Sequence, residues 1–219
     1  MYLLLYDLEK SEKYFRKYLE VNKKIKNRLG DGYGNLGMAE IRRREEKFKE
    51  AEIFYLESIK ILKEVKSEVV ENRAKMCLSN FYLSKGNLEK SKVLLDEVLK
   101  YAEREKHFIA LYCAYLLFAN YNLEVYKKIN DTKNIKDAEE FIRKGDELLR
   151  EFIREKIAPI ELYKTEIIFH SLKNEQEIVK EKEKKLNELI SNLISNIRET
   201  KNKENFLKHK DFYYFIYSC

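Results

Sequence analysis

The sequence predicts an all-α fold built as a stack of antiparallel helix pairs. Three observations lead to this prediction. A turn-like sequence recurs at a spacing of 40 residues, apolar residues follow each copy at helical spacing, and the 219-residue chain contains one proline and six glycines. So few turn-forming residues do not suffice for the many tight turns of a β-sandwich or barrel, whereas an abundance of Leu, Glu, Lys and Ala favours helices.

The recurring element is a box of five residues: a polar turn residue, an apolar residue, two polar residues and a small residue. Its four copies are Asp7-Leu8-Glu9-Lys10-Ser11, Lys47-Phe48-Lys49-Glu50-Ala51, Asn87-Leu88-Glu89-Lys90-Ser91 and Asn134-Ile135-Lys136-Asp137-Ala138. The small residues are spaced by 40, 40 and 47 positions. We expect the apolar residue to close the turn between two antiparallel helices, and the small residue to lie where these helices cross closely.

The expected helices follow from these boxes and from the breaks between apolar stripes. The first full helix runs from Asp7 to about Arg28, and Gly30-Asp31-Gly32 ends it. The later helices are expected at about 33–45, 48–66, 69–85, 88–105, 107–128, 135–156, 159–173, 176–200 and 204–217, with a polar loop from Lys127 to Asn134. The chain then forms one domain over 1–219, with units of roughly 1–30, 31–68, 69–106, 107–156 and 157–200 before the C-terminal helix.

Several positions resemble the tetratricopeptide repeat (TPR) family. Tyr33, Leu36 and Gly37 match the middle of that family's first helix, and Gly86-Asn87-Leu88 with Tyr82 matches its turn. The second helix is matched by Ala51, Tyr55 and Ser58 and more loosely by Ser91, Leu95 and Val98. The units are longer than the family's about 34 residues and look like those of bacterial peptide-sensing regulators. The resemblance covers roughly residues 1–150 and implies a right-handed superhelical solenoid.

The resemblance also implies a binding face, because the first helices of TPR units line a concave groove. The positions carried over are Asn35, Met38, Ile41 and Arg42 in one unit, and Arg73, Met76, Asn80, Leu83 and Ser84 in the next. Amides, arginines and methionines suit an extended peptide; solvent-covering residues are the alternative. One subfamily clamps a C-terminal carboxylate, and Asn35 and Arg73 match its positions. Cys77 stands where that subfamily has arginine, so we do not expect a clamp.

Motifs that suggest chemistry have simpler interpretations. Gly32-Tyr33-Gly34-Asn35-Leu36-Gly37 has the spacing of a dinucleotide-binding loop, but that loop follows a strand and here a Lys-rich helix precedes it. We interpret the glycines as a helix C-cap and a close-packing residue. His107, His170 and His209 are far apart in sequence, so we expect no metal, no cofactor and no enzymatic activity. An enzyme would need His170 to meet a cysteine or a carboxylate in a pocket.

Charge and cysteine content limit the classes of partner and the cellular compartment that we expect. The net charge of +6 is small beside 44 cations and 38 anions, and favours a solvated mixed surface. The basic runs are Lys23-Lys24-Ile25-Lys26 with Arg28, Arg42-Arg43-Arg44, and 182–185. Cys77, Cys113 and Cys219 form no CxxC pair, which favours a reducing cytoplasm. The longest apolar run, 108–119, is shorter than the about 20 residues of a membrane span, so we expect no membrane partner.

Both ends of the chain look open. Residues 1–6 are the end of a first helix, and the last helix carries Phe206, Leu207 and the apolar run 212–217. Solenoids normally finish with a polar cap, and exposed apolar patches mark interfaces. The chain is therefore either a fragment of a longer array, or its ends pack on each other or on a second copy to give a homodimer.

The sequence thus predicts a scaffold or sensor that binds a protein or peptide in its groove. The expected site residues are Asn35, Met38, Arg42, Arg73, Met76, Asn80 and Ser84. The alternative is the regulatory domain of a nucleic-acid-associated regulator, with the basic runs touching phosphate.

Overall fold

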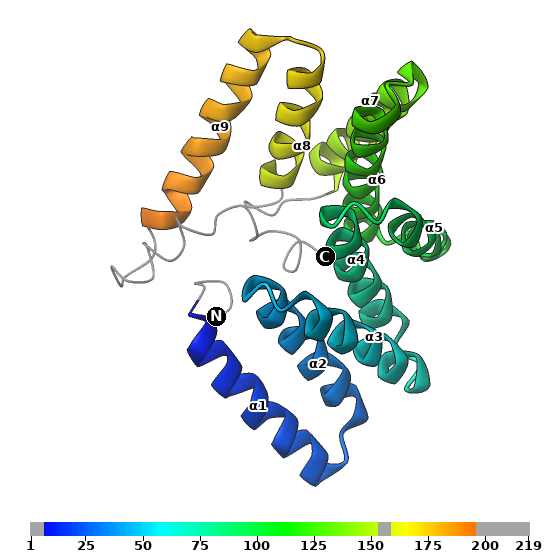
Figure 1. Cartoon of the computed structure of the whole chain (residues 1–219), viewed down its shortest axis with the longest axis vertical. Helices are drawn as coiled ribbons and strands as arrows, with labels where there is room; N and C mark the ends of the chain where they lie inside the picture. The colour runs from blue at the N-terminus through cyan, green and yellow to red at the C-terminus, as the bar shows by residue number, and fades with distance from the viewer. Residues whose placement is uncertain (1–6, 153–158, 196–219) are drawn as a thin grey trace. The chain divides into compact units, whose positions relative to one another are not determined.

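A computed structural model describes residues 7–152 and 159–195 of the chain, and over these residues it contains helices and no strand (Figure 1). The helices are α1 (Leu8–Ile25), α2 (Arg28–Arg44), α3 (Phe48–Glu64), α4 (Glu68–Ser84), α5 (Leu88–Arg104), α6 (Phe108–Ile129), α7 (Thr132–Glu151), α8 (Pro159–Leu172) and α9 (Gln176–Ser195). The all-α prediction is therefore confirmed for the described residues.

The first six helices begin at a constant interval. Their first residues are 8, 28, 48, 68, 88 and 108, so one helix and one turn occupy 20 residues and a helix pair occupies 40. Each turn has a residue with positive φ at the same place, namely Lys26, Glu46, Lys66, Gly86 and Lys106. The following backbone N–H reaches back five residues to a helix carbonyl, as in Asn27 N to Asn22 O (2.9 Å) and His107 N to Ala102 O (2.9 Å). This is the Schellman arrangement, which satisfies the carbonyls that a helix end leaves open.

Polar side chains start the next helix immediately after these turns. The Asp7 carboxylate accepts from Lys10 N, the Asn27 amide oxygen from Gly30 N, and the Asn87 amide oxygen from Lys90 N. His107 takes the same role with Nδ1, which accepts from Ala110 N at 3.2 Å. Each contact satisfies one of the donors that a helix start leaves open. Asp7 and Asn87 are the first residues of two copies of the recurring box, whereas Lys47 of the second copy makes no such hydrogen bond.

The chain divides into two compact units, and each is described by itself. Within the described residues, the first comprises 7–81 and the second comprises 82–152 with 159–195. The boundary falls inside α4, after Phe81.

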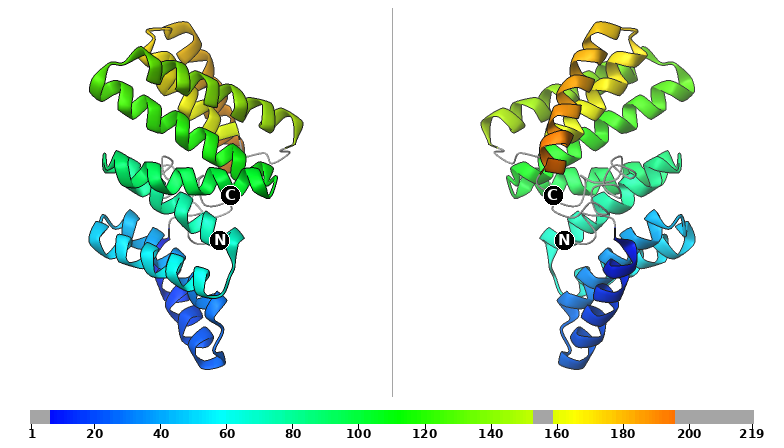
Figure 2. Two further views of the ribbon diagram at one scale, coloured as in Figure 1. Left: turned by 90° about the vertical axis from the view of Figure 1, so that its right-hand side faces the viewer. Right: turned by 90° about the vertical axis from the view of Figure 1, so that its left-hand side faces the viewer.

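In the first unit α2 packs against α1 and α3 (Figure 2). Glycines make these contacts close: a Cβ added to Gly37 would lie 2.2 Å from the Phe15 ring, and one added to Gly32 would lie 2.6 Å from the Leu62 side chain. Gly30 and Gly34 meet α1 in the same way. The Ser58 hydroxyl of α3 also donates to the Gly32 carbonyl oxygen at 2.8 Å, so the backbone of α2 itself contacts α3.

The small residues of the boxes lie where the repeat predicted them. Ser11, Ala51, Ser91 and Ala138 are all buried. Several of the apolar residues that follow at helical spacing are buried as well, namely Tyr55, Leu62, Leu95, Val98 and Ile142. Tyr18, which has the same spacing in α1, is 42% exposed and so departs from the expected inward stripe. A larger side chain at the small positions would therefore overlap neighbouring helices.

In the second unit α6 packs against α5, α7 and α8, and α8 forms a hairpin with α9 (Figure 1). Phe118 of α6 stacks on Phe141 of α7 with ring centroids 5.0 Å apart. Among the described residues, α6 is the one helix long and apolar enough to cross a membrane, and 61% of its most apolar window is buried. The helix expected at about 107–128 agrees with α6, and most of the apolar run 108–119 is buried in this unit.

Two boundaries were predicted wrongly. Gly30-Asp31-Gly32 does not end a helix, because α1 ends at Ile25 and these residues lie inside α2. Lys127 to Asn134 is not a long loop, since α6 continues to Ile129 and α7 begins at Thr132. A left-handed residue at Asn130 and a capping side chain at Asp131 suffice for that turn. The expected helix at 204–217, and the ends of those expected at 135–156 and 176–200, lie outside the described residues.

Substitution of Gly37 tests the close contact of α1 with α2. Helix propensity alone predicts that Gly37→Ala raises the free energy of unfolding by about 1 kcal/mol. We expect the opposite, a loss of about 2 kcal/mol in urea denaturation, because the new methyl group would overlap the Phe15 ring.

Gly86→Ala is the matched control. A Cβ there meets only the Lys128 amine, at 3.6 Å, but Gly86 has a φ of 71°, so the loss of about 1 kcal/mol comes from the backbone alone. Replacement of Phe15 by Ala should reduce the cost of Gly37→Ala and leave that of Gly86→Ala unchanged. A stabilising Gly37→Ala would contradict the packing of α1 on α2.

Candidate functional site

The seven residues predicted to line a groove lie on α2 and α4, but they are not equally accessible. Met38 and Met76 are each 2% exposed and belong to the core. Asn35 is half-buried, and its amide donates to the Asp31 carbonyl oxygen one turn earlier, at 2.8 Å. Ser84 is exposed at the last residue of α4, in the second unit. Accessible polar chemistry in the predicted set is therefore limited to a few positions.

Arg42 of this set holds three helices together. Its guanidinium lies 2.6 Å from Glu12 of α1 and 2.5 Å from Glu45, and Nε is 3.0 Å from Glu50 of α3. The hydrogen bond from Arg42 lowers the pKa of Glu12 to about 2, although partial burial acts in the opposite direction. A guanidinium with three carboxylates around it is not available to a ligand, so Arg42 has a structural role.

Arg73 of the predicted set lacks such partners. It is half-buried on α4, and its buried Nε has no hydrogen-bond acceptor among residues 7–152 and 159–195. Within the described residues no hydrogen bond or ion pair joins its guanidinium. Because a desolvated cation without a partner is costly, Arg73 is the side chain in this unit with most to gain from an anionic ligand.

Asn80 lies two turns after Arg73 on the same face of α4, seven residues later. It is half-buried, and in the part of the chain that the structure describes its amide makes no hydrogen bond. An amide offers both donors and an acceptor, which match a peptide backbone. Arg73 and Asn80 are therefore the two polar side chains of the predicted face that are accessible and have no partner among the described residues.

A buried ionic cluster lies in the same unit, and the sequence-based reasoning missed it. Glu40 of α2 is 2% exposed. Its Oε2 accepts from Arg43 at 2.8 Å and from Arg44 at 2.6 Å, and its Oε1 accepts from the Tyr55 hydroxyl of α3. The run Arg42-Arg43-Arg44 was considered as a basic surface, yet all three side chains are buried and paired. The spacing of Glu40 to Arg43 and Arg44, three and four residues, was the available signal.

The electrostatics of this cluster keep Glu40 ionised and disfavour the thiolate form of the nearby Cys77. Burial alone would raise the pKa of Glu40, but the charges of Arg43 and Arg44 and the Tyr55 hydroxyl lower it below its ordinary value. Burial, reinforced by the charge of Glu40, raises the pKa of the Cys77 thiol to about 12. Because the thiolate is the nucleophilic form of cysteine, this shift does not favour a catalytic role for Cys77, which is a buried core residue.

The second unit contains the histidine contact that an enzyme hypothesis would need. His170 Nδ1 lies 2.5 Å from Glu175 Oε2. The same two residues are joined through the backbone, because Glu175 N donates to His170 O at 2.9 Å. The contact closes the turn between α8 and α9, so the fold accounts for it without a reaction.

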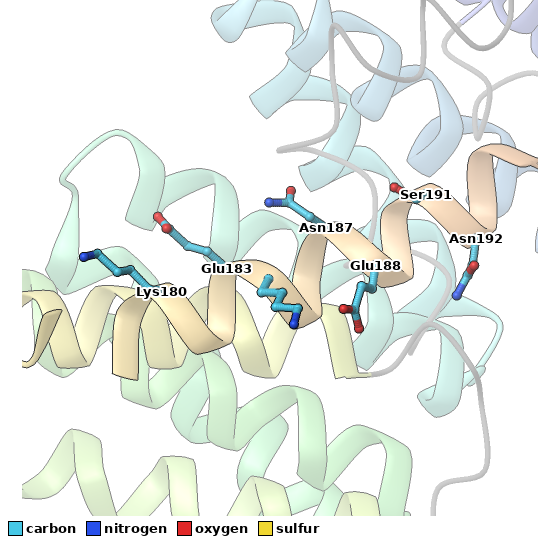
Figure 3. Close-up of a pocket in the computed structure, with 7 residues that line it drawn as sticks. Lys180, Glu183, Asn187, Glu188, Ser191 and Asn192 are labelled. Atoms are coloured by element: carbon cyan, nitrogen blue, oxygen red, sulfur yellow. The ribbon is translucent and has the colours of Figure 1, made fainter. Parts of the chain in front are cut away.

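A surface hollow runs along α9 (Figure 3). Its described lining residues are Lys180, Glu183, Lys184, Asn187, Glu188, Ser191 and Asn192, all of them from this one helix. Two lysines and two glutamates alternate along it, so it has no strong preference for one sign of charge. Catalytic and ligand sites usually combine groups from several elements in a concave space, which this helix face does not supply.

The described ranges, 7–152 and 159–195, hold no group of three His, Cys, Asp or Glu residues that could bind a metal ion. His209 and Cys219 lie outside these ranges. The comparisons with known proteins add no relative: no protein-family model matches the sequence, and no curated protein matches it. The resemblance to the TPR family therefore stays a prediction from the residues.

The Arg42–Glu12 pair makes stability dependent on pH. The pKa of Glu12 falls from an ordinary 4.5 to about 2 in the folded chain, so its contribution is complete above pH 4.5 and is lost as the pH falls towards 2. We expect Glu12→Gln to lower the free energy of unfolding by about 1 to 2 kcal/mol at pH 7, with a smaller effect at pH 3.

Urea denaturation at both pH values measures this, with Glu20→Gln on the exposed face of α1 as the control. The control should change stability little at either pH. An equal effect of Glu12→Gln at pH 7 and pH 3 would show that the ion pair does not contribute.

Proposed function

We propose that this chain is an interaction module that binds an acidic segment of a protein or peptide through the α2–α4 face of its first unit. In this proposal the helix pairs stack as the TPR resemblance implies, in a right-handed superhelix whose concave side carries Arg73 and Asn80. Binding, and not catalysis, is the activity. The observation that supports the proposal most directly is the half-buried Arg73 guanidinium without a partner in the described chain.

Arg73 differs from the other buried arginines of this unit in what it contributes to the fold. Arg42, Arg43 and Arg44 each bind carboxylates of the same unit. Removing one of them would take one cation away from the carboxylates of Glu40, or of Glu12, Glu45 and Glu50, and so weaken contacts that the fold uses. Removing Arg73 breaks no hydrogen bond or ion pair within the described residues, so the fold does not depend on its charge. A side chain that stability does not require is free to serve binding.

The ligand chemistry follows from the two side chains. A guanidinium recognises a carboxylate through paired hydrogen bonds, and the Asn80 amide can bond a backbone N–H or C=O two turns along the helix. An extended segment with at least one Asp, Glu or terminal carboxylate meets both requirements. The buried methionines Met38 and Met76 support the helices from within and do not contact this ligand.

The basic run at Arg42-Arg43-Arg44 does not favour nucleic acid, because its three guanidiniums are already paired with Glu12, Glu40, Glu45 and Glu50. Phosphate binding would have to displace these carboxylates. We therefore do not propose the nucleic-acid alternative.

A peptide array tests the proposal. The labelled full-length chain is applied to 15-residue peptides of varied sequence, and affinities of the selected peptides are measured by fluorescence polarisation. We expect the bound peptides to be rich in Asp and Glu, and Arg73→Ala to weaken them at least about tenfold, the effect of losing one charged hydrogen bond.

The matched control is Arg150→Ala, which removes an exposed arginine of α7 and changes the net charge equally. Arg73→Ala should leave the urea midpoint unchanged or raise it, whereas Arg42→Ala should lower it. Selected peptides that bind Arg73→Ala as well as the unaltered chain would refute this site, and an array without any bound peptide would refute peptide binding itself.

A further inference from the structure

Helix α1 carries a stripe of large exposed side chains. Tyr18, Val21 and Ile25 are 42%, 46% and 65% exposed. Their spacing of three and four residues places them on one face of the helix. Leu29 and Tyr33 of α2, 40% and 39% exposed, extend this surface beside α1, since Tyr18 already borders α2 at Gly34. We refer to these five residues as the α1 stripe.

The equivalent helices of the next two repeats, α3 and α5, show what this face contacts elsewhere in the chain. Adding 40 to each position of α1 gives its counterpart in α3, so Tyr18, Val21 and Ile25 correspond to Ser58, Ile61 and Val65. In α3 this face is closed by a helix: Ser58 donates to the Gly32 carbonyl oxygen of α2, and Ile61 and Leu62 lie against Gly32. Val98 and Tyr101, the α5 counterparts of Ser58 and Ile61, are also buried.

The differences between α1 and α3 define the helix that fits α1. In the second repeat, Arg28 of α2 pairs with Glu64 of α3 at 2.9 Å. The counterpart of Glu64 in α1 is Lys24, and that of Glu57 is Lys17. Neither lysine has an ion pair in the described part of the chain. The edge of α1 that carries Lys17 and Lys24 is therefore positive where the equivalent edge of α3 is negative. A helix that packs on α1 needs acidic residues at the position where α2 presents Arg28 to α3.

The size of the contact residues changes as well. Tyr18 replaces Ser58, whose small side chain allows the α2 backbone to touch α3. A helix on α1 must therefore lie farther away, as expected for one that presents side chains and not glycines.

We propose that the α1 stripe is the docking site for an amphipathic helix of a partner protein, with its apolar face on Tyr18, Val21 and Ile25 and its acidic flank on Lys17 and Lys24. The site is distinct from Arg73 and Asn80. A second copy of this chain fits less well: when two such stripes pair antiparallel, the same edges meet, so the lysines of the two copies would face each other. Helix-in-groove recognition of this kind uses anchors at three- and four-residue spacing, which the stripe provides.

Selection from a displayed library tests the proposal and does not require the partner to be identified first. The library holds 18-residue helices with a fixed apolar stripe and randomised flanks, and it is selected once against the full chain and once against Lys17→Glu/Lys24→Glu. We expect Asp and Glu to be enriched at the flanks in the first selection, and Lys and Arg in the second. Equal flank compositions in the two selections would overturn the proposal.

The affinity of the best acidic helix then locates the contact. Val21→Asp should weaken it at least tenfold, while the control Val93→Asp, at a 54% exposed valine of α5, should leave it unchanged. Arg73→Ala should also leave it unchanged, which separates this surface from the peptide face of the proposed function.

Sedimentation of the unaltered chain distinguishes a partner helix from a second copy of this chain as the occupant of the stripe. We expect the stripe not to support self-association. A dimer that Val21→Asp dissociates would assign the stripe to a second copy and overturn the assignment to a partner helix.

Discussion

The distance at which α2 can approach α1 and α3 determines the arrangement of the first unit. Gly30, Gly34 and Gly37 let one face of α2 lie against α1, and Gly32 lets the opposite face lie against α3. Leucine or alanine at these places would separate the helices by the width of a methyl group or more. The glycines weaken α2 as an isolated helix, so this helix depends on tertiary contacts on both sides for its stability.

The close approach of the helices also brings buried charged groups within reach of partners of opposite charge. Without such partners their burial would be costly. Once α2 lies against its neighbours, Arg42 is within reach of Glu12 and Glu50, and Glu40 is within reach of Tyr55. Each carboxylate is then satisfied by cations and hydroxyls of the same unit, which offsets the cost of burying it. Arg73 of α4 has no such partner among the described residues, and for this reason its guanidinium is more informative about binding than the paired arginines.

The repeat box made the starts of α1, α3 and α5 predictable because an apolar residue begins each of these helices and a small residue lies three positions later at a helix crossing. The fourth copy, at Asn134, did not predict the start of α7, which lies at Thr132. Leu8, Phe48 and Leu88 begin α1, α3 and α5 as the box predicted. The break at Gly30 to Gly32 was wrong because a glycine-rich segment is locally a helix terminator, whereas here packing on both sides requires glycine inside the helix. The same limit applies to the site. Family positions placed Arg73 and Asn80 in the predicted set, and their role in binding stays a prediction. Periodicity does not report the burial of Met38, Met76 and Arg42, because burial depends on neighbouring helices, such as α1 with Glu12, 30 residues before Arg42.

A repeat protein also provides an internal standard against which each helix can be compared. The α3 face is closed by α2 through a serine, a glycine and an Arg28–Glu64 pair. The same face of α1 keeps the apolar spacing but exchanges serine for tyrosine and glutamate for lysine. If this face of α1 were only a solvent-exposed surface, polar residues would be expected in place of Val21 and Ile25. These two residues instead occupy the positions at which α3 contacts a helix. Retained apolar spacing with an inverted edge charge is what a helix-binding surface with a different, acidic occupant requires. The first unit would then offer two surfaces of opposite character: a polar face with an unpaired cation for an extended segment, and an apolar stripe for a folded helix.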